Sequence, residues 1–570
     1  MKVSANRGIA RILKAEGCKF VSLFPACRIN NDIGDEGGIP LIMMNDERYA
    51  VAVADAYSRL GDGKRFGVCT VQGAVNAAGL EYSTGAILQA FEDNSPVLCL
   101  TDGVGPAQTD NSHFHIDRFY SQITKWTGYV ASASRVPEYM NRVYTNLKTG
   151  RPRPVLLQVP ANLGEYDEDE FLYVPVQAWK PQADPDDVRA TIKLLLKAQN
   201  PVLYVGQGVF HADGCAELLQ FVDLAQIPVI TTLKGKSAFP ENHALSLGVR
   251  GEPVEHFLNK SDLILAIGTG MSPNRFSHSI ANAKDKTIIQ NTIDTVDINK
   301  SYQVKQALLG DARLVLKQLT EECSKQGCGK RSPEVLEMIK NLKAQKAAKY
   351  NPLMTSNDTP INPYRVYGDM IKVLDPKNSF VTGDSGSPRD QTSTVWEAQI
   401  PHGYLGWGNV STLGFSLAAA IASRITFPDR QAFAIAGDAG VAYMLGNFEA
   451  AVRCNMGITI IHINNSAFAG YGPGFWGPGN DPYTYAVSPP DVINLSKAAG
   501  ALGLYSERIE KPGEIVPALK RAQDENTKNR PAYLEFICSQ YPVWATWVGL
   551  AVKGASRDYY SRPATSKPAV

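Results

Sequence analysis

Short apolar runs alternate along the chain with longer amphipathic or alanine-rich stretches. Runs such as 20–24 (FVSLF) and 66–71 (FGVCTV) have the length of buried strands, whereas 6–16 and 47–59 space their apolar residues as helices do. Strands that alternate with helices are typical of parallel sheets covered by helices on both faces. The pattern therefore predicts an α/β protein made of doubly wound parallel sheets.

The alternating pattern falls into three blocks, and 570 residues are too many for a single hydrophobic core. A segment rich in Pro and Asp, WKPQADPDD, separates the first two blocks, and a charged helical stretch that we expect to end at Asn351-Pro352 precedes the third. We expect an N-terminal domain, a central α/β domain, a helical linker, a C-terminal domain and a tail, at 1–178, 183–330, 331–359, 360–548 and 549–570.

Charge and cysteine content narrow the class of partner. The formal net charge is +1, from 57 Lys and Arg against 56 Asp and Glu, so nothing favours nucleic acid or an anionic membrane, and a small organic molecule is the expected partner. No apolar run reaches the roughly 20 residues of a spanning helix, and the N-terminus lacks the pattern of a signal peptide. Nine scattered cysteines, of which only Cys323 and Cys328 lie close together, predict reduced thiols and a cytoplasmic location.

One stretch in the third block carries the candidate chemistry. A strand ends at Gly437-Asp438-Ala439-Gly440, a helix is expected at about 446–455, and a second strand ends at Asn464-Asn465. A strand-helix-strand unit brings Asp438 and Asn465 to the same edge of a sheet. Carboxylate and amide oxygens suit Mg²⁺, and small residues after the aspartate let backbone N–H groups approach a diphosphate.

These residues resemble a known signature. In thiamine-diphosphate enzymes a Gly-Asp-Gly is followed at a similar distance by an Asn pair, and here Ala439 stands where Gly is commonest. The resemblance covers nearly the whole chain and is to the acetohydroxyacid synthase-like superfamily, which includes 2-keto acid decarboxylases, benzaldehyde lyase and 2-hydroxyacyl-CoA lyases. It implies thiamine diphosphate and Mg²⁺ as cofactors, with Asp438, the Asn465 side chain and the carbonyl of Ala467 as metal ligands.

The same resemblance implies roles for other residues. Glu47, which opens a helix just after a strand, is similar to the glutamate that activates the aminopyrimidine ring of the cofactor. Leu413 resembles the bulky residue that keeps the cofactor bent, and the carbonyl of Ser411 would accept from the aminopyrimidine. The remaining positions at which relatives touch the cofactor are Pro25, Asn76, Gly386, Ser387, Gly437, Ala439 and Gly440, with Pro388 standing where relatives often carry His.

The substrate is less clearly indicated. The segment after the asparagine pair, SAFAGYGPGFWGPG, lacks the Met-Val-x-x-x-Trp-like stretch of acetohydroxyacid synthases, which argues against synthesis of branched-chain precursors. His113 and His115 fall near the His pair of pyruvate decarboxylases and are candidates for proton shuttles or for solvated loop residues. Tyr471, Phe475 and Trp476 are candidates for the substrate pocket or for packing within a Gly-rich loop.

The expected function is a lyase or carboligase that acts next to a carbonyl group, by decarboxylating a 2-keto acid or as an acetolactate synthase-like carboligase. A 2-hydroxyacyl-CoA lyase is an alternative. From other classes, a nucleotide-binding oxidoreductase is disfavoured because residues 205–214 lack a third glycine in register, and a non-catalytic member is disfavoured by intact Glu47, Asp438 and Asn465. The family also implies a homodimer as the minimum, commonly a homotetramer, and leaves room for FAD or a CoA-type nucleotide in the central domain.

Overall fold

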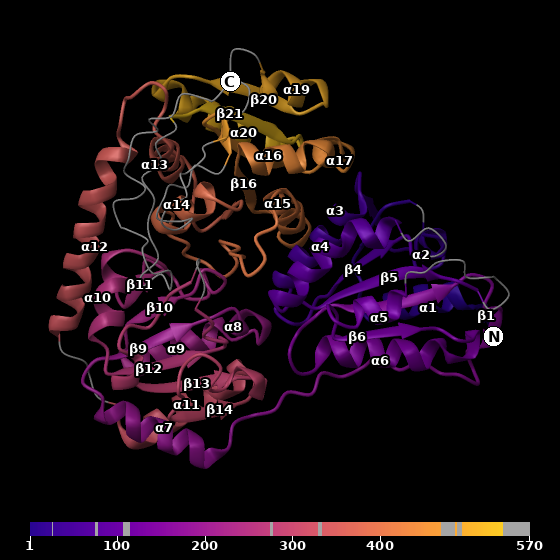
Figure 1. Ribbon diagram of the computed structural model, residues 1–570, viewed down its shortest axis with the longest axis horizontal. Helices are drawn as coiled ribbons and strands as arrows, with labels where there is room; N and C mark the ends of the chain where they lie inside the picture. The colour runs from indigo at the N-terminus through magenta and orange to yellow at the C-terminus, as the bar shows by residue number, and fades with distance from the viewer. Residues whose placement is uncertain are drawn as a thin grey trace. The chain divides into compact units, whose positions relative to one another are not determined.

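The computed structural model describes residues 1–25, 27–73, 78–105, 115–273, 277–328, 333–468, 485–486 and 493–539. The chain forms two compact units, of which the first comprises Met1–Lys180 with Asn409–Thr426 and the second comprises Pro181–Gly408 with the described residues from Phe427 onward. Three large sheets are parallel throughout, one in the first unit and two in the second (Figure 1). The predicted α/β class with three doubly wound sheets is confirmed.

The sheet of the first unit has six strands in the order β3-β2-β4-β5-β7-β6. Side chains of β5 alternate between its faces: Leu98 and Leu100 pack with α1, α2 and α6, whereas Val97 and Cys99 pack with α3 and α4. A small antiparallel pair, β1 with β8, joins the two ends of this domain. The elements are β1 (Lys2–Ser4), α1 (Ala5–Ala15), β2 (Val21–Leu23), α2 (Ile29–Asp35), β3 (Leu41–Met43), α3 (Glu47–Arg59), β4 (Gly67–Val71), α4 (Ala78–Glu92), β5 (Val97–Gly103), α5 (Ile116–Tyr120), β6 (Trp126–Tyr129), α6 (Val136–Lys148), β7 (Val155–Pro160) and β8 (Glu165–Asp167).

The second unit begins with a six-stranded sheet in the order β11-β10-β9-β12-β13-β14. The central strands β9 and β12 are buried along their whole length, as expected for a parallel sheet covered on both faces. The elements are α7 (Pro185–Lys197), β9 (Pro201–Val205), α8 (Gly208–His211), α9 (Cys215–Ala225), β10 (Val229–Thr231), β11 (Ser246–Gly248), α10 (Glu252–Lys260), β12 (Leu263–Ile267), β13 (Thr287–Thr292), β14 (Gln306–Leu309) and α11 (Ala312–Gln326).

The third sheet, also in the second unit, has five strands in the order β15-β16-β17-β21-β20. Helix α15 lies between β15 and β16 in sequence but packs in the first unit, against α3. The elements are α13 (Pro363–Val373), β15 (Ser379–Gly383), α14 (Ser387–Val395), α15 (Phe415–Thr426), β16 (Gln431–Gly437), α16 (Asp438–Met444), α17 (Phe448–Arg453), β17 (Ile458–Asn464), β18 (Ala467–Phe468), β19 (Tyr485–Ala486), α19 (Leu495–Ala501), β20 (Tyr505–Ile509), α20 (Ile515–Thr527) and β21 (Ala532–Ile537).

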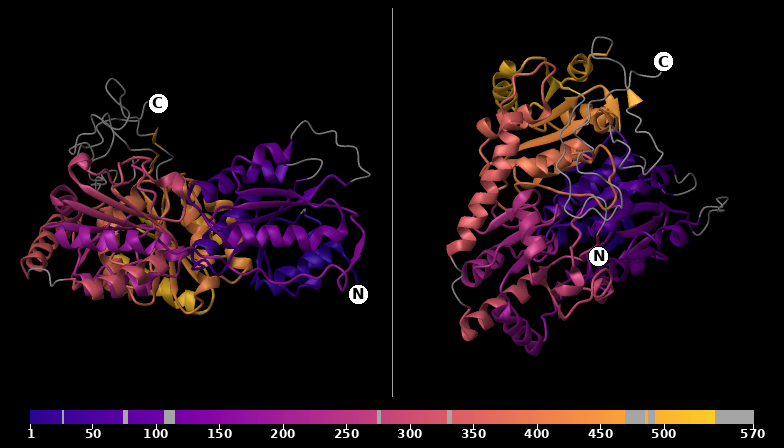
Figure 2. Two further views of the ribbon diagram at one scale, coloured as in Figure 1. Left: turned by 90° about the horizontal axis from the view of Figure 1, so that it is seen from below. Right: turned by 60° about the vertical axis from the view of Figure 1, so that its left-hand side comes forward.

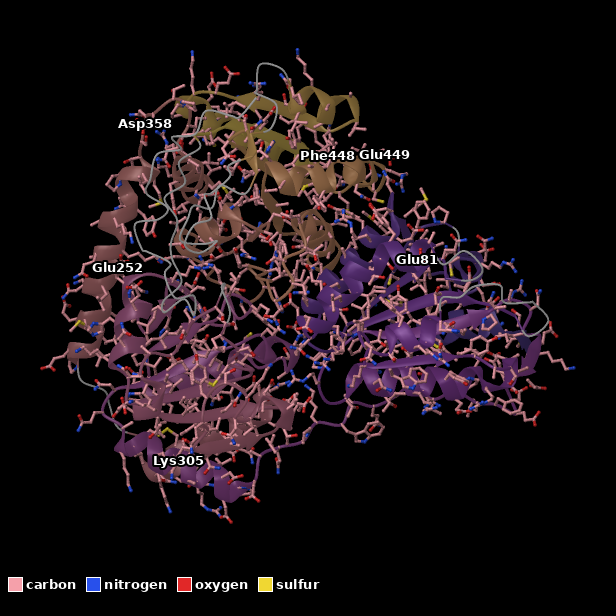
Figure 3. All side chains as sticks on the ribbon, in the orientation of Figure 1. Glu81, Glu252, Lys305, Asp358, Phe448 and Glu449 are labelled. Carbon is pink, nitrogen blue, oxygen red and sulfur yellow. A yellow bond between two sulfur atoms is a disulfide. The ribbon has the colours of Figure 1, made fainter. Side chains whose placement is uncertain are left out.

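A long helix, α12 (Pro333–Met354), connects the two sheets of the second unit and runs along the outside of that unit (Figure 2). It packs against α10 of the central domain and α13 of the C-terminal domain. Glu252, at the start of α10, lies 3.5 Å from the Lys349 ammonium of α12 (Figure 3). The expected end of this helix at Asn351-Pro352 is wrong, because Pro352 lies inside its last turn.

Two further sequence-based expectations are corrected. Cys323 and Cys328 form a disulfide, so the prediction of reduced thiols is wrong for this pair. A helix starts at Asp438 itself, earlier than the expected 446–455, and is followed by a 3-10 turn and α17. A carboxylate in a first helical turn interacts favourably with the helix dipole, which explains why the helix begins at the aspartate.

Within the part of the chain that the structure describes, every helix is too short or too polar to cross a bilayer.

Candidate active site

The candidate metal ligands lie at the carboxyl edge of the third sheet. Strands β16 and β17 are parallel neighbours, paired from Ala432 with Ile458 to Gly437 with Ile463, so the residues that follow them emerge at the same edge. The carboxylate of Asp438 is almost fully buried, and its Oδ2 accepts a hydrogen bond from the backbone N–H of Asn465 at 3.2 Å. The structure thus brings together the two residues on which the sequence prediction depended. Ligands of open α/β sheets bind at this edge.

The two asparagines after β17 differ in what their side chains do. Both polar atoms of the Asn464 amide are hydrogen-bonded within the protein. Its Nδ2 donates to Glu535 Oε1 at 2.8 Å, and its Oδ1 accepts from the Ser466 N–H at 3.0 Å. The side chain of Asn465 is half-buried and makes no hydrogen bond within the described residues. Asn465 therefore has an amide oxygen available to a ligand, and with the Asp438 carboxylate it forms the hard-oxygen donor set that suits Mg²⁺.

The candidate diphosphate loops also meet at this edge. Strands β15 and β16 pair in parallel, so α14, which starts at Ser387, and α16 begin side by side. Gly386 precedes α14 with a φ of 102°, a conformation that favours glycine, and no side chain caps either helix start. Backbone N–H groups in the first turns of uncapped helices are available to an anion.

Gly440 shows how closely these two loops pack. A Cβ atom added at Gly440 would lie 2.9 Å from Oδ1 of Asp384, which is fully buried and accepts a hydrogen bond from the Ser385 N–H. Any larger residue at position 440 would push the two loops apart. The residues present therefore fit a group that carries a diphosphate and a divalent cation at this edge.

Glu47 stands at the corresponding edge of the first unit. Asp46 caps α3 by accepting from the Tyr49 N–H at 2.8 Å, which places Glu47 in the first turn, as the sequence predicts. The Glu47 carboxylate faces the start of α4, since its Oε1 would lie 2.9 Å from a Cβ added at Gly79. The side chain is half-buried and remains reachable from solvent.

Leu413 lies in the same unit as Glu47, on a segment, 409–414, that is held by α3 and α4. The Leu413 carbonyl accepts from the Arg48 guanidinium at 3.2 Å, and the Gly414 carbonyl accepts from the Tyr49 hydroxyl at 2.7 Å. From α4, Gln89 Oε1 accepts from the Thr412 N–H at 3.2 Å. Because the backbone is bound on both sides of Leu413, its half-buried side chain is held in a fixed direction.

A buried ion cluster fixes the start of that segment. Arg59 of α3 pairs with Asp55 and with Asp93, and all three side chains are buried. The other oxygen of the Asp93 carboxylate, Oδ1, accepts a hydrogen bond from the Asn409 N–H at 3.1 Å. Ser411, the expected acceptor for the aminopyrimidine, lies between these anchors and is half-buried.

The other predicted site residues are placed less informatively. Pro25 follows β2 and is exposed, at the edge where Glu47 follows the adjacent strand β3. His115 is exposed just before α5. Ala467 lies in β18, which pairs with β19. Asn76, His113, Tyr471, Phe475 and Trp476 lie outside the described residues.

The option of a nucleotide in the central domain stays a prediction. Residues 205–214 leave β9 and form the short helix α8, and the Gly208 N–H donates to the carbonyl of Gly268, which follows β12, at 2.9 Å.

The sequence prediction missed the residues that support this site. Arg48, Tyr49, Gln89 and Asp93 act through backbone contacts with a segment more than 300 positions away, and nothing local in the sequence marks them. His462, in contrast, can be recognised from the sequence. It lies in the apolar strand ITIIHIN, where a buried histidine must find polar partners.

Comparison with known families agrees with this geometry. Three models of the thiamine pyrophosphate enzymes match the chain: the N-terminal TPP binding domain over residues 3–122, the central domain over 188–319 and the C-terminal TPP binding domain over 384–536. The chain belongs to this family. It is a thiamine-diphosphate-dependent enzyme that forms or breaks a carbon–carbon bond, which confirms thiamine diphosphate as a cofactor and the expected class of enzyme.

Curated relatives extend over most of the chain. It is 28% identical over 555 residues to a probable acetolactate synthase large subunit of Methanocaldococcus jannaschii, an alignment that covers 93% of this chain and 91% of the relative. It is also 28% identical to a probable acetolactate synthase large subunit of Methanococcus aeolicus, covering 84% and 83%. A glyoxylate carboligase of Escherichia coli O157:H7 is 26% identical over 94% of this chain and 93% of its own length.

Proposed function

We propose that this enzyme is a magnesium-dependent carboligase that decarboxylates a 2-keto acid and joins the remaining acyl unit to the carbonyl carbon of a second substrate. Relatives named acetolactate synthase and glyoxylate carboligase, each aligned over most of this chain, support the reaction class. The observation that carries the cofactor assignment is the meeting of Asp438 with Asn465 beside two uncapped helix starts.

In this proposal Asp438, the side chain of Asn465 and the carbonyl of Ala467 hold Mg²⁺. The first-turn N–H groups of α14 and α16 would hold the diphosphate, because both helix starts are uncapped. Bound thiamine diphosphate supplies a nucleophilic carbon and an electron sink, chemistry that no side chain provides.

Glu47 is the proposed proton-transfer group. Its carboxylate leaves the first turn of a helix that Asp46 caps, so its position is fixed while its side chain stays accessible. Leu413, held through its own carbonyl, is the proposed support that sets the cofactor's bend, and the Ser411 carbonyl is the proposed hydrogen-bond acceptor.

We further propose a homodimer as the minimal assembly, since the resemblance implies that the first domain of one subunit completes the cofactor site of another. Sedimentation velocity at micromolar concentration tests this. A mass of about 62 kDa, that of one chain, would contradict it.

A substrate panel tests the reaction. The full chain, supplied with thiamine diphosphate and Mg²⁺, is assayed with 2-keto acids alone, with pairs of 2-keto acids and aldehydes, and with 2-hydroxyacyl-CoA thioesters. We expect CO₂ release together with a 2-hydroxyketone or 2-hydroxy-3-keto acid product. Aldehyde release without coupling identifies a simple decarboxylase, turnover of thioesters alone identifies an acyl-CoA lyase, and either result overturns the carboligase proposal.

Substitution of Glu47 tests its role separately. Glu47→Gln keeps the size of the side chain but removes proton transfer, so kcat is expected to fall at least 100-fold, while stabilisation by thiamine diphosphate and Mg²⁺ persists. Glu449→Gln is the matched control, because Glu449 also lies in a first helical turn and pairs with Arg453 (Figure 3). Equal activity of the two variants would exclude the proposed role.

A further inference from the structure

A histidine is buried beneath the proposed metal site, in the middle of an apolar strand. His462 is fully buried on β17, where it pairs with Ala436 on one side and with Glu535 on the other. Its Nδ1 lies 2.6 Å from the hydroxyl of Tyr533, and its Nε2 lies 3.4 Å from Oδ1 of Asp438. Apolar residues fill most of this strand, so a buried imidazole there calls for an explanation.

The hydrogen-bonding roles in this chain of groups follow from elementary chemistry. Burial raises the pKa of Tyr533, so its hydroxyl keeps its proton, and we assign that proton to a hydrogen bond donated to Nδ1 of His462. A neutral imidazole that accepts at Nδ1 carries its proton on Nε2. The Nε2–H group therefore faces the Asp438 carboxylate. Nε2 is buried, makes no hydrogen bond within the described residues, and lies 3.4 Å from Oδ1 of that carboxylate.

The Asp438 carboxylate is consequently approached from two directions by protein donors. Oδ2 accepts from the Asn465 N–H, and Oδ1 faces the imidazole. The hydrogen bond to Oδ2 and the imidazole 3.4 Å from Oδ1 together restrict the rotation of this carboxylate about its Cβ–Cγ bond.

We propose that His462 is a positioning residue for the metal ligand Asp438, with its Nε2–H group held toward Oδ1 by the Tyr533 hydroxyl. Groups that hydrogen-bond to metal ligands orient them, and their loss typically weakens metal binding by roughly 10- to 100-fold. This inference rests on the proposed Mg²⁺ site and adds two residues to it, neither of which contacts the metal.

The packing around the pair keeps it rigid. Tyr533 is fully buried on β21, and the ring of Phe448, from the helix after α16, lies 5.4 Å from its ring (Figure 3). Two residues further along the same strands, Glu535 binds the Asn464 amide at 2.8 Å. Buried contacts therefore hold both Tyr533 and the end of the strand that carries His462.

The chain contains a matched control. In the central domain the Tyr204 hydroxyl lies 3.0 Å from Nδ1 of His278, both side chains are buried, and His278 Nε2 bonds to the Val249 carbonyl at 2.6 Å. This second Tyr-His pair has the same chemistry but ends on a backbone carbonyl, so removing its hydroxyl is not expected to change metal binding.

The test measures metal affinity directly. Mn²⁺, which replaces Mg²⁺ in oxygen sites, is titrated into the full chain with saturating thiamine diphosphate, and free Mn²⁺ is read by electron paramagnetic resonance. We expect His462→Leu to raise the Kd for Mn²⁺ by about 10- to 100-fold. His462→Gln, whose amide N–H can reach the carboxylate, is expected to restore most of the affinity. Tyr533→Phe is expected to raise the Kd by a smaller factor, and Tyr204→Phe to leave it unchanged.

The outcomes separate the two proposals. If the unmodified chain binds no Mn²⁺ in the presence of thiamine diphosphate, the proposed magnesium site is wrong and this inference falls with it. If it binds Mn²⁺ and His462→Leu binds equally well, only the positioning role is wrong. If His462→Leu fails to fold, the test uses Tyr533→Phe, which removes a single oxygen. A Kd for Mn²⁺ equal to that of Tyr204→Phe then overturns the inference.

Discussion

Replacing Asp93 by alanine is expected to release the segment 409–414 that carries Ser411 and Leu413. Asp93 is fully buried, and its carboxylate does two things: Oδ2 binds the Arg59 guanidinium at 2.8 Å, and Oδ1 accepts the Asn409 N–H at 3.1 Å. Alanine removes both interactions. The backbone N–H of Asn409 then loses its carboxylate acceptor.

The magnitude follows from what remains after the substitution. A hydrogen bond to a charged group contributes roughly 1.5–3 kcal/mol. Arg59 keeps both of its bonds to Asp55, at 2.7 and 2.8 Å, so its charge stays paired. Because Asn409 is exposed, water can replace its lost acceptor, and the expected loss for Asp93→Ala is the contribution of the hydrogen bond alone, about 1.5–3 kcal/mol. Asp93→Asn, which keeps an acceptor for Asn409, should lose less.

Asp55→Ala is the informative comparison. It breaks the doubly bonded ion pair and leaves Arg59 with Asp93 alone, so it should destabilise the domain by about 3–5 kcal/mol, more than Asp93→Ala does. Asp93 nevertheless remains in place to bind the Asn409 N–H. Asp55→Ala is thus expected to be the less stable of the two variants. Asp93→Ala is nevertheless expected to have the less restrained segment 409–414.

Hydrogen exchange followed by mass spectrometry separates these effects, with denaturant unfolding as the measure of stability. Under native conditions, peptides that cover 409–414 should exchange about 10-fold faster or more in Asp93→Ala, because each 1.4 kcal/mol of lost local stability is one factor of ten. In Asp55→Ala the same peptides should change much less. Unchanged exchange in Asp93→Ala, or an equal increase in both variants, would refute the anchoring role.

Two further predictions concern the diphosphate loops and the pH dependence of stability. Gly440→Ala should weaken the affinity for thiamine diphosphate at least 10-fold, measured by calorimetry, because its Cβ would meet Asp384. The control is Gly446→Ala, whose Cβ would meet no atom within 4 Å and which should bind normally. Equal affinities of the two variants would contradict the prediction. Burial lowers the pKa of His278 to about 4 from 6.5, so the unfolded chain binds a proton that the folded chain does not. The contribution of neutral His278 to the free energy of unfolding is fully present above pH 6.5 and is lost as the pH falls toward 4. About 2 kcal/mol of it is lost by pH 5. The Tm of His278→Gln should therefore fall less between pH 7.5 and 5 than the Tm of the unmodified chain does. An equal fall in Tm would show that His278 does not titrate this way.

Local sequence was sufficient where a pattern and its cap lie together. The helix expected at 47–59 has those bounds, since Asp46 caps it and an alanine-rich run follows. The juxtaposition of Asp438 with Asn465 also followed from sequence, because neighbouring parallel strands end at one edge. Strand β20 (YSERI) lacked an apolar run because it lies at the edge of its sheet and is only partly buried.

What local sequence could not provide was contact between distant segments. Tyr533 lies 71 positions from His462, and Arg48 lies 365 positions from Leu413, so neither partner is visible in a local window. The packing of α15 with the first unit, away from the strands that flank it in sequence, is a long-range fact of the same kind. Such contacts arise from the packing of whole domains.

In the proposed site, thiamine diphosphate is held through a metal ion at Asp438 and Asn465. Calorimetric titration of thiamine diphosphate into the full chain, with Mg²⁺ and then with EDTA, tests it most directly. We predict saturable binding of one molecule per chain that requires the metal and is weakened at least 100-fold by Asp438→Asn. Binding of equal strength in EDTA and in Asp438→Asn, or no binding under any condition, would contradict the claim.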